Sequence, residues 1–258
     1  MNNKFKGIKK FVFETSVIII GISISFWLSN LQAKSDDYNM EVEILEAIEV
    51  NIDEIQKYLD NRRETLDADN HLMDYLSIHW DDLNLDSIVE VLQYGTHMKA
   101  FHNVFLDYRE FHPPVSEITS IIGDGSISLI SNRDIKIQLI SLIDNSYDFV
   151  NQNVNSEIEL QQSFRNQLVQ EDSYDISRIL ETTQNEMAQR VSGEVDNREK
   201  ILAELKAITK LRAAKNYLNL KIRQRFWVML FYNNFERSLN TLDEMVDKEL
   251  KSIRWKRL

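Results

Sequence analysis

Residues 11–31 read FVFETSVIIIGISISFWLSNL, an apolar run that contains a single charged side chain, Glu14. As an α-helix these residues span about 31 Å, close to the thickness of the hydrocarbon core of a bilayer. Four lysines precede the run, whereas one lysine and two aspartates follow it closely. Because positive charge stays on the cytoplasmic side, the pattern predicts a cytoplasmic tail over 1–10, a transmembrane helix over 11–31 and an extracytoplasmic domain over 32–258.

Two other interpretations of this run are open. A cleaved signal peptide also has a basic start and an apolar centre, but the one small-residue exit, Leu31-Gln32-Ala33, has an unfavourable leucine three residues before the cut. A buried helix of a soluble protein is compatible with the serines, whereas four lysines at one end favour a membrane. The preferred interpretation is a single-pass inner-membrane protein with a cytoplasmic N-terminus and a periplasmic bulk.

Glu14 and a stripe of small residues distinguish the predicted span. A carboxylate within hydrocarbon is costly, so Glu14 is a candidate functional residue, although Lys10 lies one turn away and can pair with it at the interface. Gly21, Ser25 and Ser29 follow at four-residue spacing, a pattern that lets two helices approach closely. This stripe predicts helix association in the membrane.

The rest of the chain is predicted to be all-α. Its six glycines are few and its two prolines are adjacent, so little interrupts a helix. Apolar residues recur at helical spacing from Ile44 to Leu59, and they predict one helix from the membrane to about residue 67. A last helix over 197–252 would be about 80 Å long. The expected fold is a transmembrane helix that continues into an elongated bundle with a very long C-terminal helix.

The elements between these two helices are predicted to be shorter. The adjacent prolines and the Gly123-Asp124-Gly125 turn bound one helix. Alternating residues predict an extended turn over 126–130, and Ser131 with Asp134 resembles a capping box for a helix that reaches residue 170. The other predicted helices cover 71–77, 86–94, 98–110 and 176–191.

Residues 226–232, FWVMLFY, are apolar on every side of the predicted last helix, and we call them the belt. Seven residues are too few to cross a bilayer. The belt is therefore expected at the thickest part of the bundle or beneath another chain. Its candidate contact residues are Phe226, Trp227, Met229, Leu230 and Phe231.

The net charge is −11, and it is unevenly distributed. Acidic residues dominate the middle of the chain, whereas lysine and arginine dominate after residue 197. We expect these two parts to pack on each other, although two solvated faces would show the same pattern. The acidic character argues against a nucleic-acid-binding protein.

The sequence contains no motif for catalysis, for a metal or for a cofactor. It has no cysteine, no His-Glu-x-x-His, no phosphate-binding glycine loop and no Gly-x-Ser-x-Gly elbow. Asp67, Asp69 and His71 alternate and could hold a cation, but surface residues commonly show this spacing. Arg223 and Arg225 could stack a ligand beside a tryptophan, but pairing with the acidic middle is preferred. We expect no enzyme and no cofactor.

Two stretches resemble a family of single-pass membrane proteins of Bacteroidota that has no established activity. From Glu14, six residues lead to GISIS and then to LSNL, which is similar to the family's Glu, six residues, Gly-Ile-x-Ile-Ala and Ile-Asn-Asn-Trp. Leu31 departs from the family's tryptophan. Residues 116–143, SEITSIIGDGSISLISNRDIKIQLISLI, are similar to its second motif of helix, turn, asparagine and helix. The resemblance implies a one-pass, periplasm-facing helical protein.

These observations predict a membrane-anchored periplasmic structural or interaction protein that self-associates or docks on a membrane partner. The alternative is a sensory or ligand-binding module acting through such a partner, since helical bundles bind small molecules between helices. A cytoplasmic tail of about ten residues is too short for an output domain. If the last helix returns to the bilayer, the basic residues and the tryptophan of 253–257 could contact anionic lipid.

Overall fold

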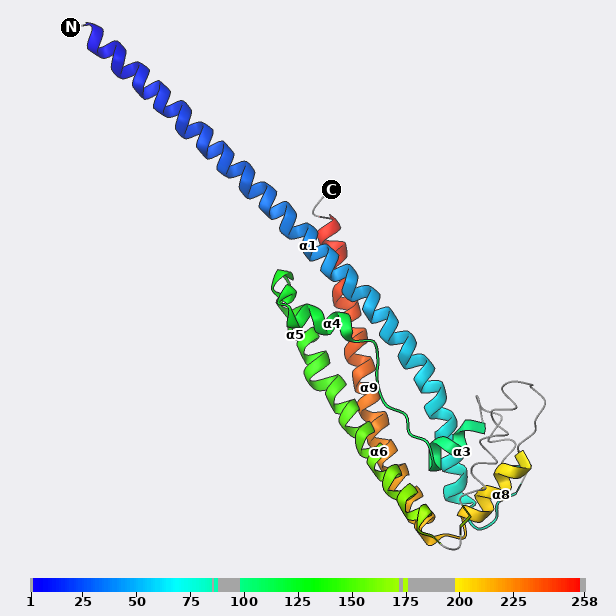
Figure 1. The fold of residues 1–258 in the computed structure, drawn as a ribbon. Helices are drawn as coiled ribbons and strands as arrows, with labels where there is room; N and C mark the ends of the chain where they lie inside the picture. The colour runs from blue at the N-terminus through cyan, green and yellow to red at the C-terminus, as the bar shows by residue number, and fades with distance from the viewer. Residues whose placement is uncertain (1, 85, 88–97, 172–173, 176–197, 256–258) are drawn as a thin grey trace, which may run out of the picture.

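The protein is an elongated bundle of α-helices with one helix that extends far beyond it (Figure 1). Its structure is a computed structural model of residues 1–258. The structure describes residues 2–84, 86–87, 98–171, 174–175 and 198–255, with only the backbone described for 2–22, 24, 26, 28–36, 98–100, 198 and 201. Within these ranges the chain forms helices and no strand, which confirms the all-α prediction.

α1 (Asn2–Ile78) is a continuous helix of 77 residues. After Gly7 it contains one glycine and no proline, so no residue forces it to end early. The prediction that this helix ends near residue 67 is wrong. Leu72 and Leu76 are fully buried and hold the last two turns of α1 against the bundle, so the short helix predicted over 71–77 is the end of α1.

The predicted membrane span lies in the part of α1 that extends beyond the bundle (Figure 1). Among the described residues, no helix is both long and apolar enough to cross a membrane. The side chains of Glu14, Gly21 and Ser29 lie outside the described residues, and so do most others of the span. Ser25 is described and is exposed.

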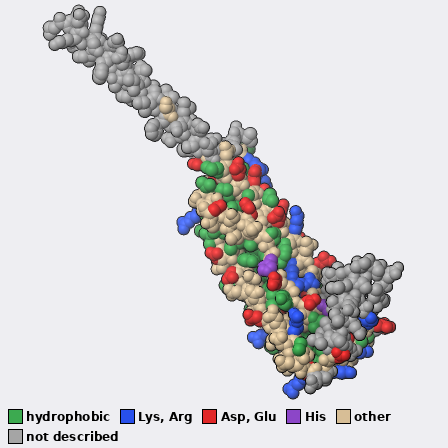
Figure 2. All heavy atoms as spheres, viewed as in Figure 1, with side chains coloured by type: hydrophobic (Ala, Val, Ile, Leu, Met, Phe, Trp, Pro, Cys, Tyr) green, Lys and Arg blue, Asp and Glu red, His purple; other side chains and the backbone are tan. Residues whose placement is uncertain are grey.

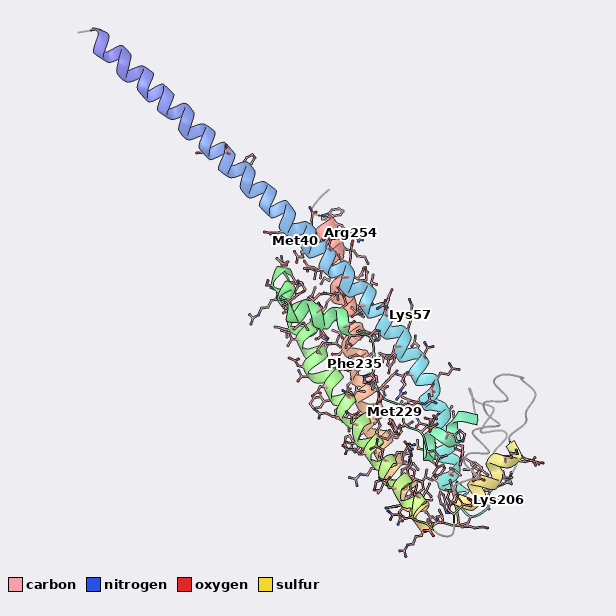
Figure 3. All side chains as sticks on the ribbon, in the orientation of Figure 1. Met40, Lys57, Lys206, Met229, Phe235 and Arg254 are labelled. Atoms are coloured by element: carbon pink, nitrogen blue, oxygen red, sulfur yellow. The ribbon has the colours of Figure 1, made fainter. Side chains whose placement is uncertain are left out.

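α9 (Arg212–Trp255) runs back along α1 in the opposite direction. Arg63 Nη2 contacts Glu236 Oε2 at 2.5 Å, and Arg254 Nη2 contacts Glu46 Oε1 at 2.9 Å. The C-terminal end of α9 therefore lies beside α1 where the N-terminal part of α1 leaves the bundle. Figure 3 labels Met40 and Arg254 at this end.

The prediction of one unbroken helix over 197–252 is wrong. α8 (Arg198–Ile208) and α9 are separated at residues 209–211. The carbonyl of Thr209 accepts a hydrogen bond from Trp80 Nε1 at 3.0 Å. The turn also brings Ile208 and Leu211 into one apolar cluster with the end of α1, which offsets the helical hydrogen bonds lost there.

α3 (Met98–Phe105) ends before the predicted boundary at residue 110. The prolines and the glycine turn bound α4 (Ser116–Gly123) as expected, and Gly125 adopts a φ of 86°, which glycine tolerates best. The predicted helices over 86–94 and 176–191 lie outside the described residues, apart from residues 86 and 87.

The segment after α4 differs from the prediction in two respects. η1 (Ser126–Leu129) is a short 3₁₀ helix rather than an extended turn. The N-cap of α5 (Arg133–Ser141) is Asn132, whose side chain accepts from the backbone N–H groups of Asp134 and Ile135, so Ser131 is not the cap. Ser131 is instead bonded to Glu41 on α1.

α5 continues through a π-helical turn, η2 (Leu142–Tyr147), into α6 (Asp148–Val169), which ends at the predicted place. Because a π-helical turn contains more residues than an α-helical turn, it shifts which residues of the continuous helix α5–η2–α6 face the core. Leu139 before this turn and Leu142 at its first position are buried, whereas Ile143 and Tyr147, which continue the four-residue apolar spacing from Leu139, are half-buried.

The described residues form two apolar clusters, one at each end of the bundle. One joins α1, α4, α5, α6 and α9, and the other joins the ends of α1 and α6 to α3, α8 and the beginning of α9. Along α9, Val228 belongs to the first cluster and Leu218 to the second. The buried residues of α9 between Leu218 and Val228 are Lys221 and Arg225, so charged side chains separate the two apolar clusters.

Candidate functional site

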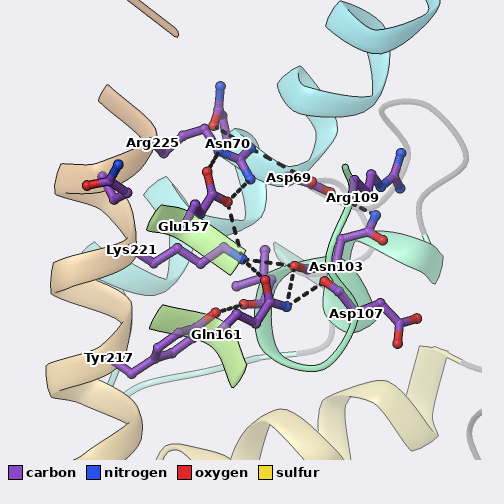
Figure 4. A network of polar contacts seen from close by, with 12 residues as sticks. Asp69, Asn70, Asn103, Asp107, Arg109, Glu157, Gln161, Tyr217, Lys221 and Arg225 are labelled. Atoms are coloured by element: carbon purple, nitrogen blue, oxygen red, sulfur yellow. Dashed lines mark hydrogen bonds and ion pairs between the residues drawn. The ribbon is translucent and has the colours of Figure 1, made fainter. Parts of the chain in front are cut away.

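A layer of buried polar side chains crosses the bundle between its two apolar clusters (Figure 4). On α6 the buried positions run Val150, Val154, Glu157, Gln161 and Phe164, at alternating spacings of four and three residues. The same spacing on α1 and α9 places polar residues at core positions of both helices. We call this set the polar layer, and its members are Asp69, Asn103, Glu157, Gln161, Lys221 and Arg225.

Glu157 and Arg225 form a bidentate ion pair at the centre of the layer. Arg225 Nε donates to Glu157 Oε2 at 3.0 Å, and Arg225 Nη2 donates to Glu157 Oε1 at 2.5 Å. The third guanidinium nitrogen, Nη1, lies 3.8 Å from Asp69 Oδ2. Such paired geometry fixes both the distance and the rotation between two helices, here α6 and α9.

Lys221 is 1% exposed and its ammonium group is fully engaged. Its Nζ atom donates to the carbonyl of Asn103 at 3.0 Å and to Gln161 Oε1 at 2.7 Å, and it lies 3.4 Å from Glu157 Oε1. An ammonium group has three N–H donors, and these three acceptors match them. Lys221 therefore acts as a structural cross-link rather than as a free amine nucleophile.

Asn103 and Gln161 connect α3 to the layer. Asn103 Nδ2 donates to Asp69 Oδ1 at 3.0 Å. Gln161 Nε2 donates to the carbonyls of Asn103 at 2.9 Å and of Asp107 at 2.5 Å, and so it satisfies backbone groups where α3 ends. Tyr217 adds a hydrogen bond from its hydroxyl to the carbonyl of Val104 at 2.5 Å. The layer thus holds the chain after α3 against the three long helices.

Burial and charge pairing shift the pKa values of the layer in opposite directions. Burial alone would raise the pKa of Glu157, but Arg225 and Lys221 lower it to about 2. Burial lowers the pKa of Lys221 to about 8 against the opposing effect of Glu157. Burial raises the pKa of Asp69, although Arg225 opposes this, and Glu157 raises the pKa of Arg225 although burial opposes it.

The two carboxylates and two cations of the layer balance one another when all four are charged. Burying an ion pair yields little net stability, but removing one partner leaves an uncompensated charge that is costly. Any displacement of α6 along α9 would break these pairs. The arrangement thus defines the register of the bundle, as buried polar residues do in coiled coils.

A small cavity of about 20 Å³ adjoins the layer. Arg62, Asp69, Arg109 and Arg225 line it together with apolar side chains. This volume holds about one or two water molecules. Arg62 Nη2 donates to the carbonyl of Arg109 at 2.7 Å, so the cavity is bounded by a further bond between α1 and the segment after α3.

The belt is divided by the structure rather than buried as a unit. Val228 and Tyr232 lie in the core, whereas Phe226 is 62% exposed, Trp227 41% and Leu230 39%. Met229 and Phe231 are half-buried. The bundle therefore covers only part of the belt, because the buried face of α9 passes through Arg225 and Val228 and turns Phe226 outward, and coverage of the rest by another chain stays a prediction.

The exposed part of the belt continues onto α6. Phe149, itself 46% exposed, stacks on Phe231 with ring centroids 5.4 Å apart. Trp227 lies between Phe231 and Phe226, at centroid distances of 6.4 Å and 5.4 Å. We call this set the aromatic surface, and its members are Phe149, Phe226, Trp227, Leu230 and Phe231.

The remaining candidates from the sequence are the alternating trio on α1 and the two arginines on α9. Asp69 is buried and paired, whereas Asp67 and His71 are exposed, so the alternating trio is not brought together. Among the residues that the structure describes, no three histidine, aspartate or glutamate side chains are grouped so that they could hold a metal ion. Arg225 pairs with the acidic middle of the chain, as preferred, and Arg223 is exposed.

The polar layer was missed at the level of sequence, although a signal for it exists. Apolar residues alone suggest a core stripe on α9 that passes from Leu218 to Ile222 and Phe226. A strict four-three spacing passes from Leu218 to Lys221, Arg225 and Val228, which are the buried residues. Charged residues that continue such a spacing are therefore candidates for buried pairs.

Fold and site together define an elongated helical bundle whose two cores are separated by a buried ion-pair layer. No family model matches the chain, and neither a curated protein nor a solved structure matches it. The resemblance to the Bacteroidota membrane-protein family stays a prediction.

Proposed function

We propose that this chain is a membrane-anchored interaction protein, held in an inner membrane by residues 11–31 and presenting its bundle on the periplasmic side. The bundle self-associates or docks on a partner in the same membrane. The observation that carries this proposal is the aromatic surface. A contiguous patch of exposed aromatic side chains marks a contact site. Aromatic residues also contribute most of the binding energy at many protein interfaces.

The geometry of α1 supports the anchoring part of the proposal. The helix continues without a break from the apolar run into the bundle. A continuous helix transmits position and orientation from the membrane to the bundle, since it contains no flexible joint. The positive charge before the apolar run supports a cytoplasmic N-terminus.

The polar layer supports a structural role over a chemical one. Its charged groups are paired with one another, and the cavity beside it has room for water and little else. The alternative, a module that binds a small ligand within the polar layer, has less support because the cavity there is far smaller than the ~300–1,000 Å³ of a usual ligand cavity.

Site-specific photo-crosslinking in intact cells tests the proposal. A photoreactive phenylalanine analogue at Phe226 is expected to link the full-length chain to a second protein or to another copy. The same analogue at Val169, which is 68% exposed at the far end of α6, serves as the matched control. Monomers alone at both positions, with the protein in the membrane fraction, would contradict the proposal.

A further inference from the structure

A groove lies between α1 and the α4–η1 segment, at the end of the bundle where α1 emerges. Its volume is about 290 Å³. Apolar side chains form its floor and carboxylates its rim. The apolar residues that line it include Met40, Ile44 and Ile121, and the carboxylates are those of Glu43, Glu117 and Asp124.

The C-terminal end of α9 has the opposite character. Trp255 is 78% exposed, and Lys251 and Arg254 are exposed beside it. The sequence continues with Lys256 and Arg257. We call residues 251–255, the last described residues of α9, the C-terminal tail. An aromatic side chain among basic ones is complementary to an apolar groove with an acidic rim.

The groove and the tail lie at the same level along α1. Arg254 contacts Glu46, and the groove is lined by α1 from Met40 to Ala47. They lie on different sides of the helix, since at about 100° per residue Glu46 and Ile44 point in widely different directions. An exposed stripe lies between them, formed by Asn39 and by Val50, which is 59% exposed, with Glu43 at its border with the groove.

We propose that two copies of this chain pack side by side and in parallel, with Trp255 and the basic side chains of each C-terminal tail seated in the groove of the other, while Ile253 stays in the core of its own chain. The inference rests on the proposed self-association and names its partner as a second copy. A two-fold axis parallel to α1, in front of the exposed stripe, exchanges its two sides. Each tail then meets the partner's groove at its own level, and the same contact forms twice.

Within one chain Lys251 pairs with Asp247 and Arg254 pairs with Glu46, but both pairs are exposed and hold the cations weakly, so these side chains can turn to a partner's groove. Each groove rim carries Glu43, Glu117 and Asp124, and each tail brings at least Lys251 and Arg254. Ion pairs at a rim add little affinity, but they orient the partners and exclude wrong registers. Trp255 supplies an apolar anchor of the kind that fills an interface pocket.

The small-residue stripe of the predicted span is in phase with this interface. Gly21 and Ser25 precede Asn39 and Glu43 by about 18 residues, which is about five turns of helix. Because α1 is unbroken, the two pairs lie on the same face of the helix. The same two-fold axis therefore brings the small residues of both spans together in the membrane.

Cysteine cross-linking between two differently tagged full-length copies tests this arrangement, since the chain has no cysteine of its own. One copy carries Ser120→Cys in the groove and the other carries Ser252→Cys on the tail; neither change removes a charge or an aromatic ring. With a short thiol-specific reagent in membranes, we expect about tenfold more linked heterodimer than with the control pair. The control replaces Ser120→Cys with Ser163→Cys, an exposed serine at the far end of α6.

Charge reversal supplies a second test. Glu117→Lys in the groove copy is expected to reduce linking about tenfold, and Arg254→Glu in the tail copy is expected to restore it. Dimers by native mass spectrometry, with linking no higher than in the control pair, would overturn this arrangement and leave self-association intact. Monomers alone would overturn self-association as well. A tail that binds anionic vesicles and links to no groove would also overturn the arrangement.

Discussion

Both carboxylate oxygens of Glu41 accept hydrogen bonds from Ser131, one from its backbone N–H at 2.5 Å and one from its hydroxyl at 2.8 Å. Glu41 is buried on α1, and Ser131 directly precedes the N-cap of α5. Asn132 in turn donates from Nδ2 to Glu249 Oε2 on α9 at 2.7 Å. Three helices are thus joined beside the groove.

Glu41→Ala is expected to lower the free energy of unfolding by about 2–3 kcal/mol, because it leaves a buried backbone donor and a hydroxyl without their charged acceptor. Thermal unfolding of the full-length protein in mild detergent, followed by circular dichroism, measures this. Glu49→Ala, a half-buried position on the same helix, serves as the control and should change the value by about 0.5 kcal/mol or less. Equal losses in the two variants would contradict the role of Glu41.

Glu157→Gln is expected to cost about 3–5 kcal/mol, since it leaves Arg225 and Lys221 buried with one carboxylate between them. Chemical denaturation of the full-length chain gives the difference. Glu159→Gln, two residues along α6 and exposed, changes the same chemistry on the surface and should have almost no effect. A small effect of Glu157→Gln would show that the carboxylate of Glu157 is not needed to compensate the buried charges of Arg225 and Lys221.

The same ion pair predicts a stability that depends on acid pH. The pKa of Glu157 is about 2 in the folded chain and 4.5 ordinarily, so its contribution is complete above pH 4.5 and is lost as the pH falls towards 2. Asp69 acts in the opposite sense, because burial raises its pKa. The difference in unfolding free energy between the natural chain and Glu157→Gln should therefore shrink over this interval. A difference that is constant with pH would contradict the lowered pKa.

Tyr217→Phe removes the hydroxyl that donates to the carbonyl of Val104 and keeps the ring, which stacks on Phe164 at a centroid distance of 4.1 Å. We expect a loss of about 1–2 kcal/mol. Tyr108→Phe, at a more exposed tyrosine in the neighbouring loop, is the matched control. If both variants unfold at the temperature of the natural chain, the hydroxyl contributes nothing to the junction of α3 and α9.

The coarse fold could be predicted from the scarcity of glycine and proline, as α1 and α9 show. The break at residues 209–211 could not, because Ile208 and Leu211 keep a spacing that an unbroken helix would also have. The break depends on Trp80 reaching the carbonyl of Thr209, a contact between residues far apart in sequence. Local patterns contain no information about such a contact.

The site was harder to predict than the fold. Lys221 and Glu157 look like surface charges in a chain rich in charge, and only their place in the four-three spacing distinguishes them. The belt was recognised as a feature, but which of its residues are exposed was not predicted, because the buried side of α9 follows Arg225 and Val228 rather than the apolar residues alone. The π-helical turn η2 altered the register of α6 in a similar way.

The central claim is that a helix within residues 11–31 crosses the membrane and leaves the bundle outside the cytoplasm. Single cysteines in an otherwise cysteine-free chain test it directly, with a maleimide that cannot cross membranes applied to intact spheroplasts. We predict that Ser120→Cys is labelled at once and that Asn3→Cys is labelled only after lysis, with the protein in the washed membrane fraction. Labelling of Asn3→Cys in intact spheroplasts, protection of Ser120→Cys, or recovery of the chain in the soluble fraction would contradict the claim.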